Sequence, residues 1–173
     1  MGKVFTEKLE SKRLMFRGFK ESDAQDVFEY SKDKDVVKYL TWKAHKNIND
    51  TIESINSYLI NPGIYAIVLK ESEKVIGCID ISLIEAKKAT FGYVLNKSYW
   101  NKGYMSETLS AFIRYLFDEC GVEEIIGKCE KENIASANVM KKCNMRWIRR
   151  VDGEKINNKI ATYDHYSIKK ATN

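Results

Sequence analysis

A polar segment between a strand pattern and a strongly amphipathic helix pattern carries the clearest chemical signal in this chain. It reads Tyr99-Trp100-Asn101-Lys102-Gly103-Tyr104-Met105-Ser106-Glu107. The first turn of a helix offers unpaired backbone N–H groups and a partial positive charge, which together suit a pyrophosphate. Gly103 lets the backbone approach such a ligand closely, and Ser106 is placed to cap the helix through its hydroxyl. The spacing therefore predicts an anion site at this bend.

The chain has no Gly-x-x-x-x-Gly-Lys-Ser/Thr sequence and no Gly-x-Gly-x-x-Gly fingerprint. The bend is therefore neither a Walker loop nor a dinucleotide-binding turn. On composition alone, the segment is equally consistent with an ordinary loop in which Gly103 makes a turn and Ser106 caps the helix.

Apolar periodicity predicts the elements that position the bend. After it, Leu109, Phe112, Ile113, Leu116 and Phe117 recur at the i, i+3, i+4 spacing of a core-facing helix. Runs rich in β-branched residues, separated by turn residues, predict the strands. The expected strands are 13–19, 64–69, 75–83, 89–95, 124–129, 146–151 and 160–168, and the other helices start near 22, near 49 and at 133.

The predicted order is β-α-α-β-β-β-α-β-α-β-β. The helix between 89–95 and 124–129 is long enough to be a crossover connection, so these two strands must be parallel. The flanking hairpins are antiparallel. We therefore expect an α/β (α+β) fold with a mixed, mostly antiparallel central sheet and flanking helices.

Local residues predict where several helices begin and end. Ser22 with Gln25 is typical of a capping box, and Pro62-Gly63 stops the second helix. Gly121 and Asn144 are placed to adopt the left-handed conformation that ends the two later helices.

The composition indicates a globular protein. The chain has 173 residues, of which 44% are hydrophobic and 31% charged, and we expect a single domain over 1–173. The net charge of +5 comes from 29 basic and 24 acidic residues that are scattered along the chain, which disfavours nucleic-acid binding as the main role. The apolar runs are too short to span a membrane, and the first residues lack a secretory signal. We expect a cytoplasmic protein with no membrane partner and no direct nucleic-acid partner.

The cysteines and histidines do not predict a metal site. Four cysteines match no zinc or redox spacing, and two histidines are too few for a multi-histidine site: Cys78, Cys120, Cys129, Cys143, His45 and His165. In a reducing cytoplasm we expect free and mostly buried thiols, with Cys143 on a helix surface.

The bend resembles the acetyl-CoA pyrophosphate loop of the GNAT N-acetyltransferases, and more narrowly that of the branch containing the RimJ/RimL ribosomal-protein acetyltransferases. Three further segments resemble the opening, the fourth-helix motif and the last strand of this branch. They are Arg13-Leu14 with Arg17 and Asp23-Ala24, Asn133-x-x-Ser136-x-x-Val139 with Lys142-Cys143-Asn144-Met145, and Tyr166-Ser167-Ile168. The matches occur in the expected order and span residues 12 to 168.

The chain also departs from the family pattern. The pattern Arg/Gln-x-x-Gly-x-Gly/Ala falls on residues 100–105, where only the central glycine fits strictly. Thr90 stands where an acidic residue often opens the fourth strand. The tyrosine that many members use as general acid falls on Met140, and a glutamate of the RimL-like enzymes falls on Lys155, beside Glu154.

The resemblance implies acetyl-CoA as cosubstrate and no metal. It implies that strands 89–95 and 124–129 splay apart, so that the pantetheine arm pairs with the exposed strand edges. An N–H of Val94 or Leu95 would stabilise the thioester oxyanion. The implied cofactor contacts are Val94, Leu95, Asn101, Lys102, Gly103, Tyr104, Met105, Ser106 and Asn133. Asn133 is equally well placed to be an N-cap residue alone.

The implied reaction is direct transfer of an acetyl group to a primary amine. Attack needs a neutral amine, and an α-amine with a pKa of about 8 needs less help than a lysine with a pKa near 10.4. Glu154 is the candidate base, with Glu85 as a second, and Ser136 is the candidate acid for the leaving thiolate. As structural residues, Ser136 is a first-turn hydroxyl and Glu154 a solvated turn acid. Direct transfer needs no acyl-enzyme, so Cys129 has little support as a nucleophile.

The acceptor implied by this branch is the N-terminal amine of a protein or peptide, such as a ribosomal protein. A polyamine or aminoglycoside acceptor stays open, and a strongly acidic acceptor pocket would favour it. A non-catalytic acyl-CoA-binding module also stays open, as does the choice between monomer and homodimer. Trp42 and His45 lie where this family builds its acceptor wall; their alternative roles are a core tryptophan and a surface histidine.

Overall fold

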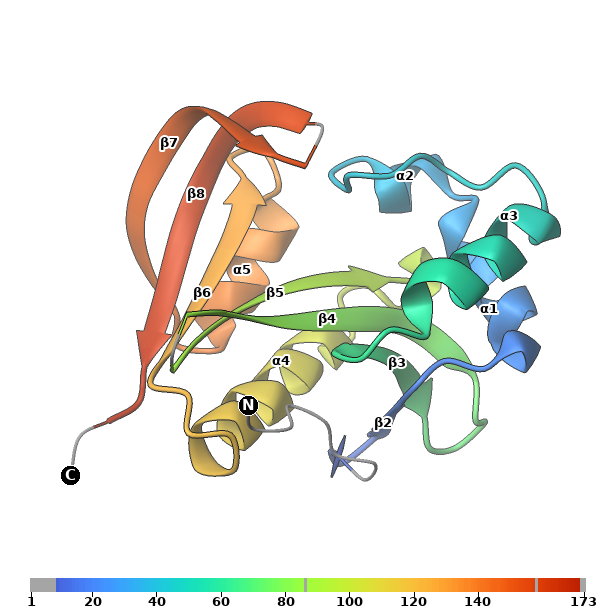
Figure 1. Cartoon of the computed structure of the whole chain (residues 1–173), viewed down its shortest axis with the longest axis horizontal. Coiled ribbons are helices and arrows are strands. Elements are labelled where there is room, and N and C mark those ends of the chain that lie inside the picture. Colours follow the sequence, from blue (N-terminus) through green and yellow to red (C-terminus); the bar gives the residue numbers. More distant parts are fainter. Residues whose placement is uncertain (1–8, 86, 158, 172–173) are drawn as a thin grey trace.

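The structure is a computed structural model that describes residues 9–85, 87–157 and 159–171. The predicted elements are present, and a two-residue strand and a one-turn helix are added (Figure 1). The strands are β1 (Leu9–Glu10), β2 (Leu14–Arg17), β3 (Ile64–Leu69), β4 (Val75–Glu85), β5 (Lys88–Leu95), β6 (Glu124–Glu130), β7 (Arg146–Ile156) and β8 (Lys159–Lys169). The α-helices are α1 (Ala24–Ser31), α2 (Lys34–Val37), α3 (Ile48–Ser54), α4 (Tyr104–Asp118) and α5 (Ile134–Lys142).

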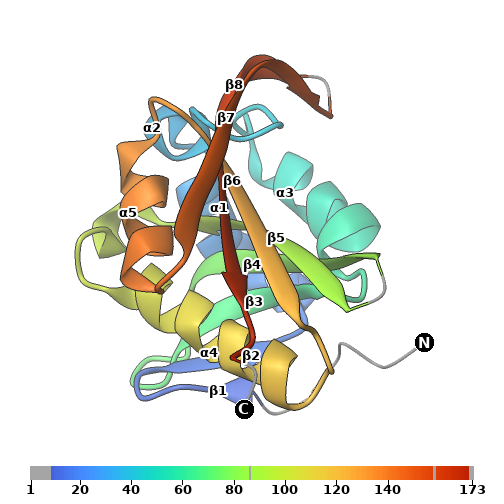
Figure 2. The ribbon, with the colours of Figure 1, turned by 90° about the vertical axis from the view of Figure 1, so that its left-hand side faces the viewer.

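The strands form one sheet in the order β1-β2-β3-β4-β5-β6-β8-β7. The β5–β6 pair, which α4 connects, is parallel, and the other neighbouring pairs are antiparallel. This confirms the predicted α/β fold with its mixed, mostly antiparallel sheet. Figure 2 shows β6 and β8 side by side at the end of the sheet away from β2.

Strands β5 and β6 pair over only three residues each. Their register runs from Lys88 opposite Glu124 to Thr90 opposite Ile126. Beyond those residues β5 continues beside β4, while β6 continues beside β8. The two strands therefore diverge, as Figure 1 shows, and the divergence opens toward the end of β5 that leads into the bend.

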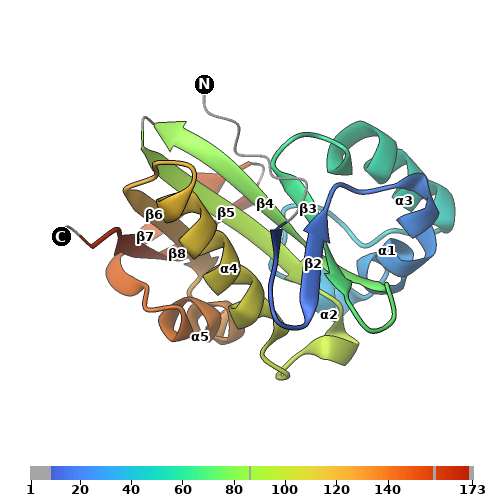
Figure 3. The same cartoon turned by 90° about the horizontal axis from the view of Figure 1, so that it is seen from below.

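Two layers of side chains cover the sheet, one on each face. Helices α4 and α5 pack on one face, here called the α4 face, and Figure 3 shows α4 lying across β4 and β5. Helices α1 and α3 cover the other, here called the α3 face, through a second core that contains Tyr30 and Ile55. The predicted stripe of α4 is confirmed, because Leu109, Phe112 and Leu116 are each 1% exposed.

Several local predictions hold and others are wrong. Gly121 and Asn144 have the expected positive φ, of 68° and 61°. The capping box at Ser22 is wrong: the Asp23 carboxylate instead accepts from Lys20 N–H at 2.9 Å and is paired with Arg17, since a carboxylate satisfies both a backbone donor and a guanidinium.

The placement of Cys143 on a helix surface is also wrong. The cysteines are free as expected, but Cys143 is 5% exposed, with its thiol 3.4 Å from the Ser106 carbonyl oxygen. It fills the contact between the end of α5 and the start of α4, where a small apolar side chain fits. Within the described ranges, no helix is both long and apolar enough to cross a bilayer.

Candidate active site

The bend delivers the start of α4 to the open end of the split between β5 and β6. Gly103 is the N-cap of α4 and has a left-handed φ of 80°, which favours glycine. Because Gly103 has no side chain, the first-turn N–H groups of Tyr104, Met105 and Ser106 receive no side-chain cap. The predicted cap by Ser106 is therefore wrong. Ser106 lies one turn too far along the helix, and its N–H is among the donors left for a ligand.

An arginine fixes the bend to the start of the sheet. Arg13 donates from Nε to Glu107 at 2.7 Å and from Nη1 to the Lys102 carbonyl at 3.1 Å, and its guanidinium stacks 4.0 Å from the centre of the Tyr104 ring. Burial would raise the pKa of Glu107, but hydrogen bonds from Arg13 and Ser11 outweigh it and lower that pKa. The acid in the first turn of α4 is thus neutralised by an ion pair and does not repel an anion at the bend.

The free edge of β5 faces the split. Asn96 N–H bonds the Ile76 carbonyl, and Ile81 N–H bonds the Gly63 carbonyl on the other side of β4. Because N–H groups alternate between the two edges of a strand, Val94 points its N–H at β4, whereas Tyr93 and Leu95 point theirs at the split. The Leu95 carbonyl oxygen already accepts a hydrogen bond from Trp100 Nε1 at 2.8 Å. Two strand N–H groups therefore remain available at the open end.

A pair of hydroxyls lies on the α4 face of the split. Asn133 is the N-cap of α5, as predicted, and its side-chain oxygen accepts from Ser136 N–H at 3.2 Å. The hydroxyl of Ser136 on α5 is 2.9 Å from the hydroxyl of Tyr93 on β5. Burial is the main cause that raises the pKa of Tyr93, so Tyr93 stays protonated and able to donate. Burial likewise raises the pKa of Cys129 to about 11, which disfavours a nucleophilic thiolate.

A cluster of charged side chains lies on the opposite, α3 face of the split. Glu154 on β7 accepts from Lys128 Nζ at 2.7 Å and lies 2.5 Å from His165 Nε2. Lys128 and His165 are directly opposite each other on β6 and β8. Gly127 and Cys129 point to the α4 face, so the alternation of a strand places Lys128 and its partners on the other face.

A β-bulge determines which face of β7 carries the Glu154 side chain. The β7–β8 register shifts between Val151 opposite Tyr163 and Glu154 opposite Ala161, so β7 has one extra residue there. Gly153 supplies the positive φ, of 65°. A one-residue insertion exchanges the two faces of a strand. It therefore turns the Glu154 side chain to the same face as His165.

The environment of Glu154 keeps it ionised. Its side chain is 17% exposed and that of His165 is 6% exposed. Burial alone would raise the pKa of Glu154, but the hydrogen bonds from Lys128 and His165 outweigh it and lower that pKa. Glu154 is therefore not the solvated turn acid that a hairpin position suggests.

The tip of the β7–β8 hairpin contacts the segment after α2, and Figure 1 shows the two side by side above the split. Asn157 Nδ2 donates to Thr41 Oγ1 at 3.3 Å, and Lys159 Nζ donates to the Lys38 carbonyl at 3.2 Å. Just beyond lie Trp42, 37% exposed, and His45, whose rings are 5.3 Å apart. The alternative role of Trp42 as a core residue is therefore wrong, and His45 is half-buried with Nδ1 2.8 Å from Thr51 Oγ1.

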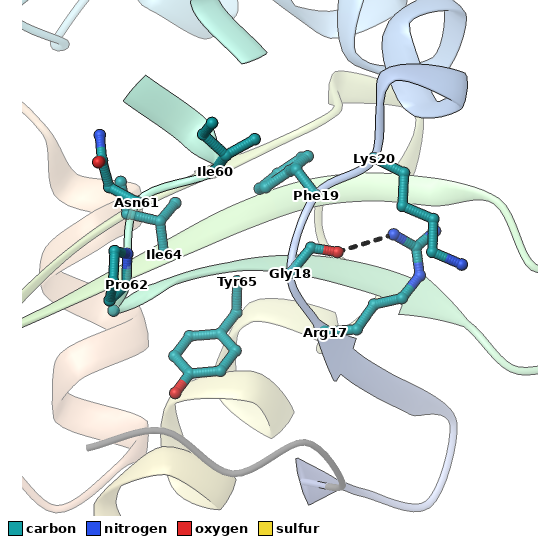
Figure 4. Close-up of a pocket in the computed structure, with 10 residues that line it drawn as sticks. Arg17, Gly18, Phe19, Lys20, Ile60, Asn61, Pro62, Ile64 and Tyr65 are labelled. Atoms are coloured by element: carbon teal, nitrogen blue, oxygen red, sulfur yellow. Dashed lines mark hydrogen bonds between the residues drawn. The ribbon is translucent and has the colours of Figure 1, made fainter. Parts of the chain in front are cut away.

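A separate pocket of about 420 Å³ lies where β2 leaves the edge of β3 (Figure 4). It is lined by residues 17–20 and 60–65, none of which is a predicted site residue. Arg17 Nη1 donates to the Gly18 carbonyl at 3.0 Å beside it. The described residues contain no group of three or more His, Cys, Asp or Glu side chains placed to hold a metal ion. Glu85, the second candidate base, has a side chain outside the described part of the chain.

Sequence reasoning missed Tyr93, Lys128 and His165. In the sequence, nothing distinguishes Tyr93 from the other aromatic residues of the strands. Lys128 and His165 lie 37 positions apart, so no local pattern connects them. Their contact depends on the β6–β8 register, which no local pattern reports. The alternation of 124–130 and 159–169 could have placed both residues on one face once their pairing was known.

A sheet split between two parallel strands, with the uncapped start of a helix at its open end, is the architecture of an acetyl-CoA-binding acetyltransferase. The family model described as the acetyltransferase (GNAT) domain matches residues 13–146. The chain therefore belongs to the GNAT family, and it is an acetyl-CoA-dependent N-acetyltransferase.

Known relatives agree with this assignment. An uncharacterized N-acetyltransferase of Bacillus subtilis strain 168, YnaD, is 35% identical over 147 residues, which are 79% of this chain and 81% of that protein. A GNAT-family acetyltransferase structure from Bacillus anthracis has a TM-score of 0.84 and 29% identity, over 94% of this chain and 98% of that one. The structure of RimL, a ribosomal L7/L12 alpha-N-protein acetyltransferase in complex with coenzyme A, has a TM-score of 0.79 and 20% identity, over 94% of this chain and 98% of that one; this likeness shows a shared fold.

Proposed function

We propose that the acceptor is the N-terminal α-amine of a protein or peptide, such as a ribosomal protein, as in the RimJ/RimL branch. The charge pattern on the α3 face of the split carries this proposal. Two of the acids there are each paired with a lysine: Glu154 with Lys128, and Glu130 with Lys159. A third, Asp80, lies opposite Gly92 and accepts from the Tyr58 hydroxyl at 2.9 Å. A polyamine or aminoglycoside needs unpaired carboxylates to bind its several cations, whereas a single α-amine does not.

The residues at the bend fit a pyrophosphate. The uncapped N–H groups of Tyr104, Met105 and Ser106 would bind its oxygens, and Gly103 leaves the approach open. Asn101 and Lys102 are exposed beside them. Lys102 adds a positive charge, and Asn101, with a φ of 59°, adds a second left-handed turn. Asn133 has its side-chain oxygen engaged with Ser136, which leaves its amide N–H₂ for the cofactor.

Acetyl-CoA would supply the activated acetyl group along the split. Leu95 would donate its N–H to the acyl or pantetheine carbonyl oxygens, and Tyr93 would donate the next one along β5. Val94 has its N–H directed at β4 and would contribute its side chain instead, which packs against the core on the α3 face. Ser136, supported by the Tyr93 hydroxyl, would donate to the leaving sulfur.

In this proposal, the proton of the acceptor amine leaves on the α3 face, and the hydroxyl pair on the other face serves the leaving sulfur. The cluster of Glu154, Lys128 and His165 lies on that face, at the level of Gly92 across the split, since Lys128 and Gly92 each lie two residues beyond the last β5–β6 pair. An added Cβ at Gly92 would meet nothing within 4 Å. We assign this region to the acceptor and the base function to the cluster that contains Glu154.

The experiment is an acceptor screen read by thiol release from acetyl-CoA. Each peptide is tested with a free and with a blocked N-terminus, beside spermidine and an aminoglycoside. We expect release with free N-termini alone, and mass spectrometry should place the acetyl group on the α-nitrogen. Release with the polyamine or aminoglycoside alone, or acetylation of lysine side chains in blocked peptides, would refute the proposed acceptor. Coenzyme A binding without turnover on any amine would indicate a non-catalytic module.

A further inference from the structure

We propose that His165, and not Glu154, takes the proton from the acceptor amine, with Glu154 and Lys128 acting as positioning residues. This assignment rests on the proposed function, because it specifies the base for the same acceptor site. It follows from the geometry of the three side chains, from their burial, and from the hydrogen-bonding capacity that each has left.

Glu154 has little capacity left for a proton from substrate. Oε1 accepts from Lys128 Nζ at 2.7 Å, and Oε2 lies 2.5 Å from His165 Nε2. Both oxygens thus have donors on a side chain that is 17% exposed. A carboxylate held by two donors is stabilised in its ionised form, which makes it a weak base and a good hydrogen-bond acceptor.

His165 has the complementary arrangement. Its Nε2 is directed at the Glu154 carboxylate, so the ring is fixed as the donor in that bond and Nδ1 is left as the acceptor. Among the described residues, Nδ1 has no hydrogen-bond partner and is not one of the fully buried unsatisfied atoms. Imidazole is the side chain that most often serves as a general base near neutral pH.

The arrangement follows the carboxylate–imidazole logic of hydrolase triads, in which an acid orients the ring and stabilises its protonated form. Lys128 fixes the other carboxylate oxygen, so that Glu154 presents one oxygen to the ring. The bulge at Gly153 is what brings the carboxylate onto this face. Without this inserted residue, Glu154 would lie on the opposite face from His165.

The proton balance is complete without further reagents. The acceptor arrives as an ammonium group, and His165 Nδ1 takes one proton and later returns it to solvent. The amine lone pair forms the N–C bond, and the C–S bond breaks with its electron pair moving to sulfur. The nitrogen then loses its second proton to solvent through the regenerated His165, and the sulfur gains a proton from the Ser136 hydroxyl, which recovers one from solvent. The products are an N-acetyl amine, coenzyme A and one released proton.

Other charged groups near His165 bear on any pH profile. Lys128 faces it from β6, and Glu154 and Arg149 face it from β7, with Arg149 directly opposite in register. Tyr163 is the next residue on the same face of β8. The test must therefore compare variants within this set.

The experiment measures kcat/KM for a peptide α-amine against pH in the wild type, His165→Gln, Glu154→Gln and Lys128→Gln, the last of which removes the other donor to the Glu154 carboxylate. Thermal unfolding and coenzyme A titration confirm that each variant folds and binds. We expect His165→Gln to lower kcat/KM by about 100-fold or more and to abolish the acidic limb. Glu154→Gln should keep that limb, because the imidazole that takes the proton is still present.

The opposite pattern would overturn the proposal. A limb lost in Glu154→Gln and kept in His165→Gln identifies Glu154 as the base. If His165→Gln does not fold, the pH profile of Glu154→Gln distinguishes the two candidates by itself: an acidic limb that is kept supports His165 as the base, and one that is lost identifies Glu154. A series of amines of decreasing pKa adds a second readout: the deficit of His165→Gln should shrink along it, whereas a purely structural defect would stay constant. If the wild-type protein binds coenzyme A but acetylates no amine, the result refutes the proposed function and not only the assignment of the base.

Discussion

Replacing Gly103 with glutamate tests whether the bend binds phosphate. Gly103 has a φ of 80°, and an ideal Cβ there would meet Arg13 Nη2 at 3.6 Å, an ordinary contact. A side chain therefore fits, at a conformational cost of about 1–2 kcal/mol for the left-handed backbone. Gly103→Gln bears the same cost and bulk, so the difference between Gly103→Glu and Gly103→Gln isolates the charge.

The expected size of that difference follows from Coulomb's law. A carboxylate about 4 Å from a phosphate charge is repelled by about 4 kcal/mol at an effective dielectric of 20 and by about 1 kcal/mol in bulk water. Gly103 is exposed, so we expect a value between these limits. This corresponds to coenzyme A binding that is about 10- to 100-fold weaker in Gly103→Glu than in Gly103→Gln.

The assay is a calorimetric titration of coenzyme A into both variants at low and at high salt. The difference should shrink at high salt, because exposed charges are screened. Equal affinities of the two variants at low salt would show that no phosphate lies near Gly103. The bend would then be an ordinary helix start.

Three further substitutions test other parts of the site and fold. Ser136→Ala should lower kcat by about 10- to 100-fold with unchanged coenzyme A affinity, and an unaltered kcat would remove its role as acid. Gly77→Ala places a Cβ 2.3 Å from the Val94 carbonyl oxygen, so it should lower the free energy of unfolding by about 1–3 kcal/mol in denaturant. Gly92→Ala, which has open space around the added Cβ, is the control. Equal stability of the two variants would contradict the close packing of β4 on β5. Hydrogen bonds and the Arg17 partner outweigh burial and lower the pKa of Asp23, so this carboxylate stabilises the fold above its unfolded pKa, and that stabilisation is lost as pH falls through its folded pKa. Asp23→Asn should therefore reduce the loss of unfolding free energy at acidic pH. An unchanged loss would show that Asp23 does not cause it.

Most of the fold could be predicted because its signals are local. The stripe from Leu109 to Phe117 and the β-branched runs around Val75 report burial directly through their period. Gly121 and Asn144 mark helix ends because few residues tolerate a positive φ. The ends of strands were less predictable: β7 extends past its predicted end at 151 to Ile156, through a bulge that local patterns do not reveal.

The site was only partly predictable, because half of it depends on register. The bend around Gly103 is contiguous in sequence, so a single segment carries its signal. The cluster of Lys128, Glu154 and His165 joins three strands, and its geometry depends on the β6–β8 pairing and on one inserted residue. The hydroxyl pair of Tyr93 and Ser136 likewise joins a strand to a helix 43 residues away.

The most direct test of the central claim is a titration of the isotopically labelled protein with coenzyme A, followed by backbone amide NMR. If the cofactor lies along the split with its phosphates at the bend, the largest amide shifts should occur at Tyr93 and Leu95 and across Gly103 to Ser106, with Val94 less affected. Shifts confined to the separate pocket formed by residues 17–20 and 60–65, or no shifts at all, would contradict the account.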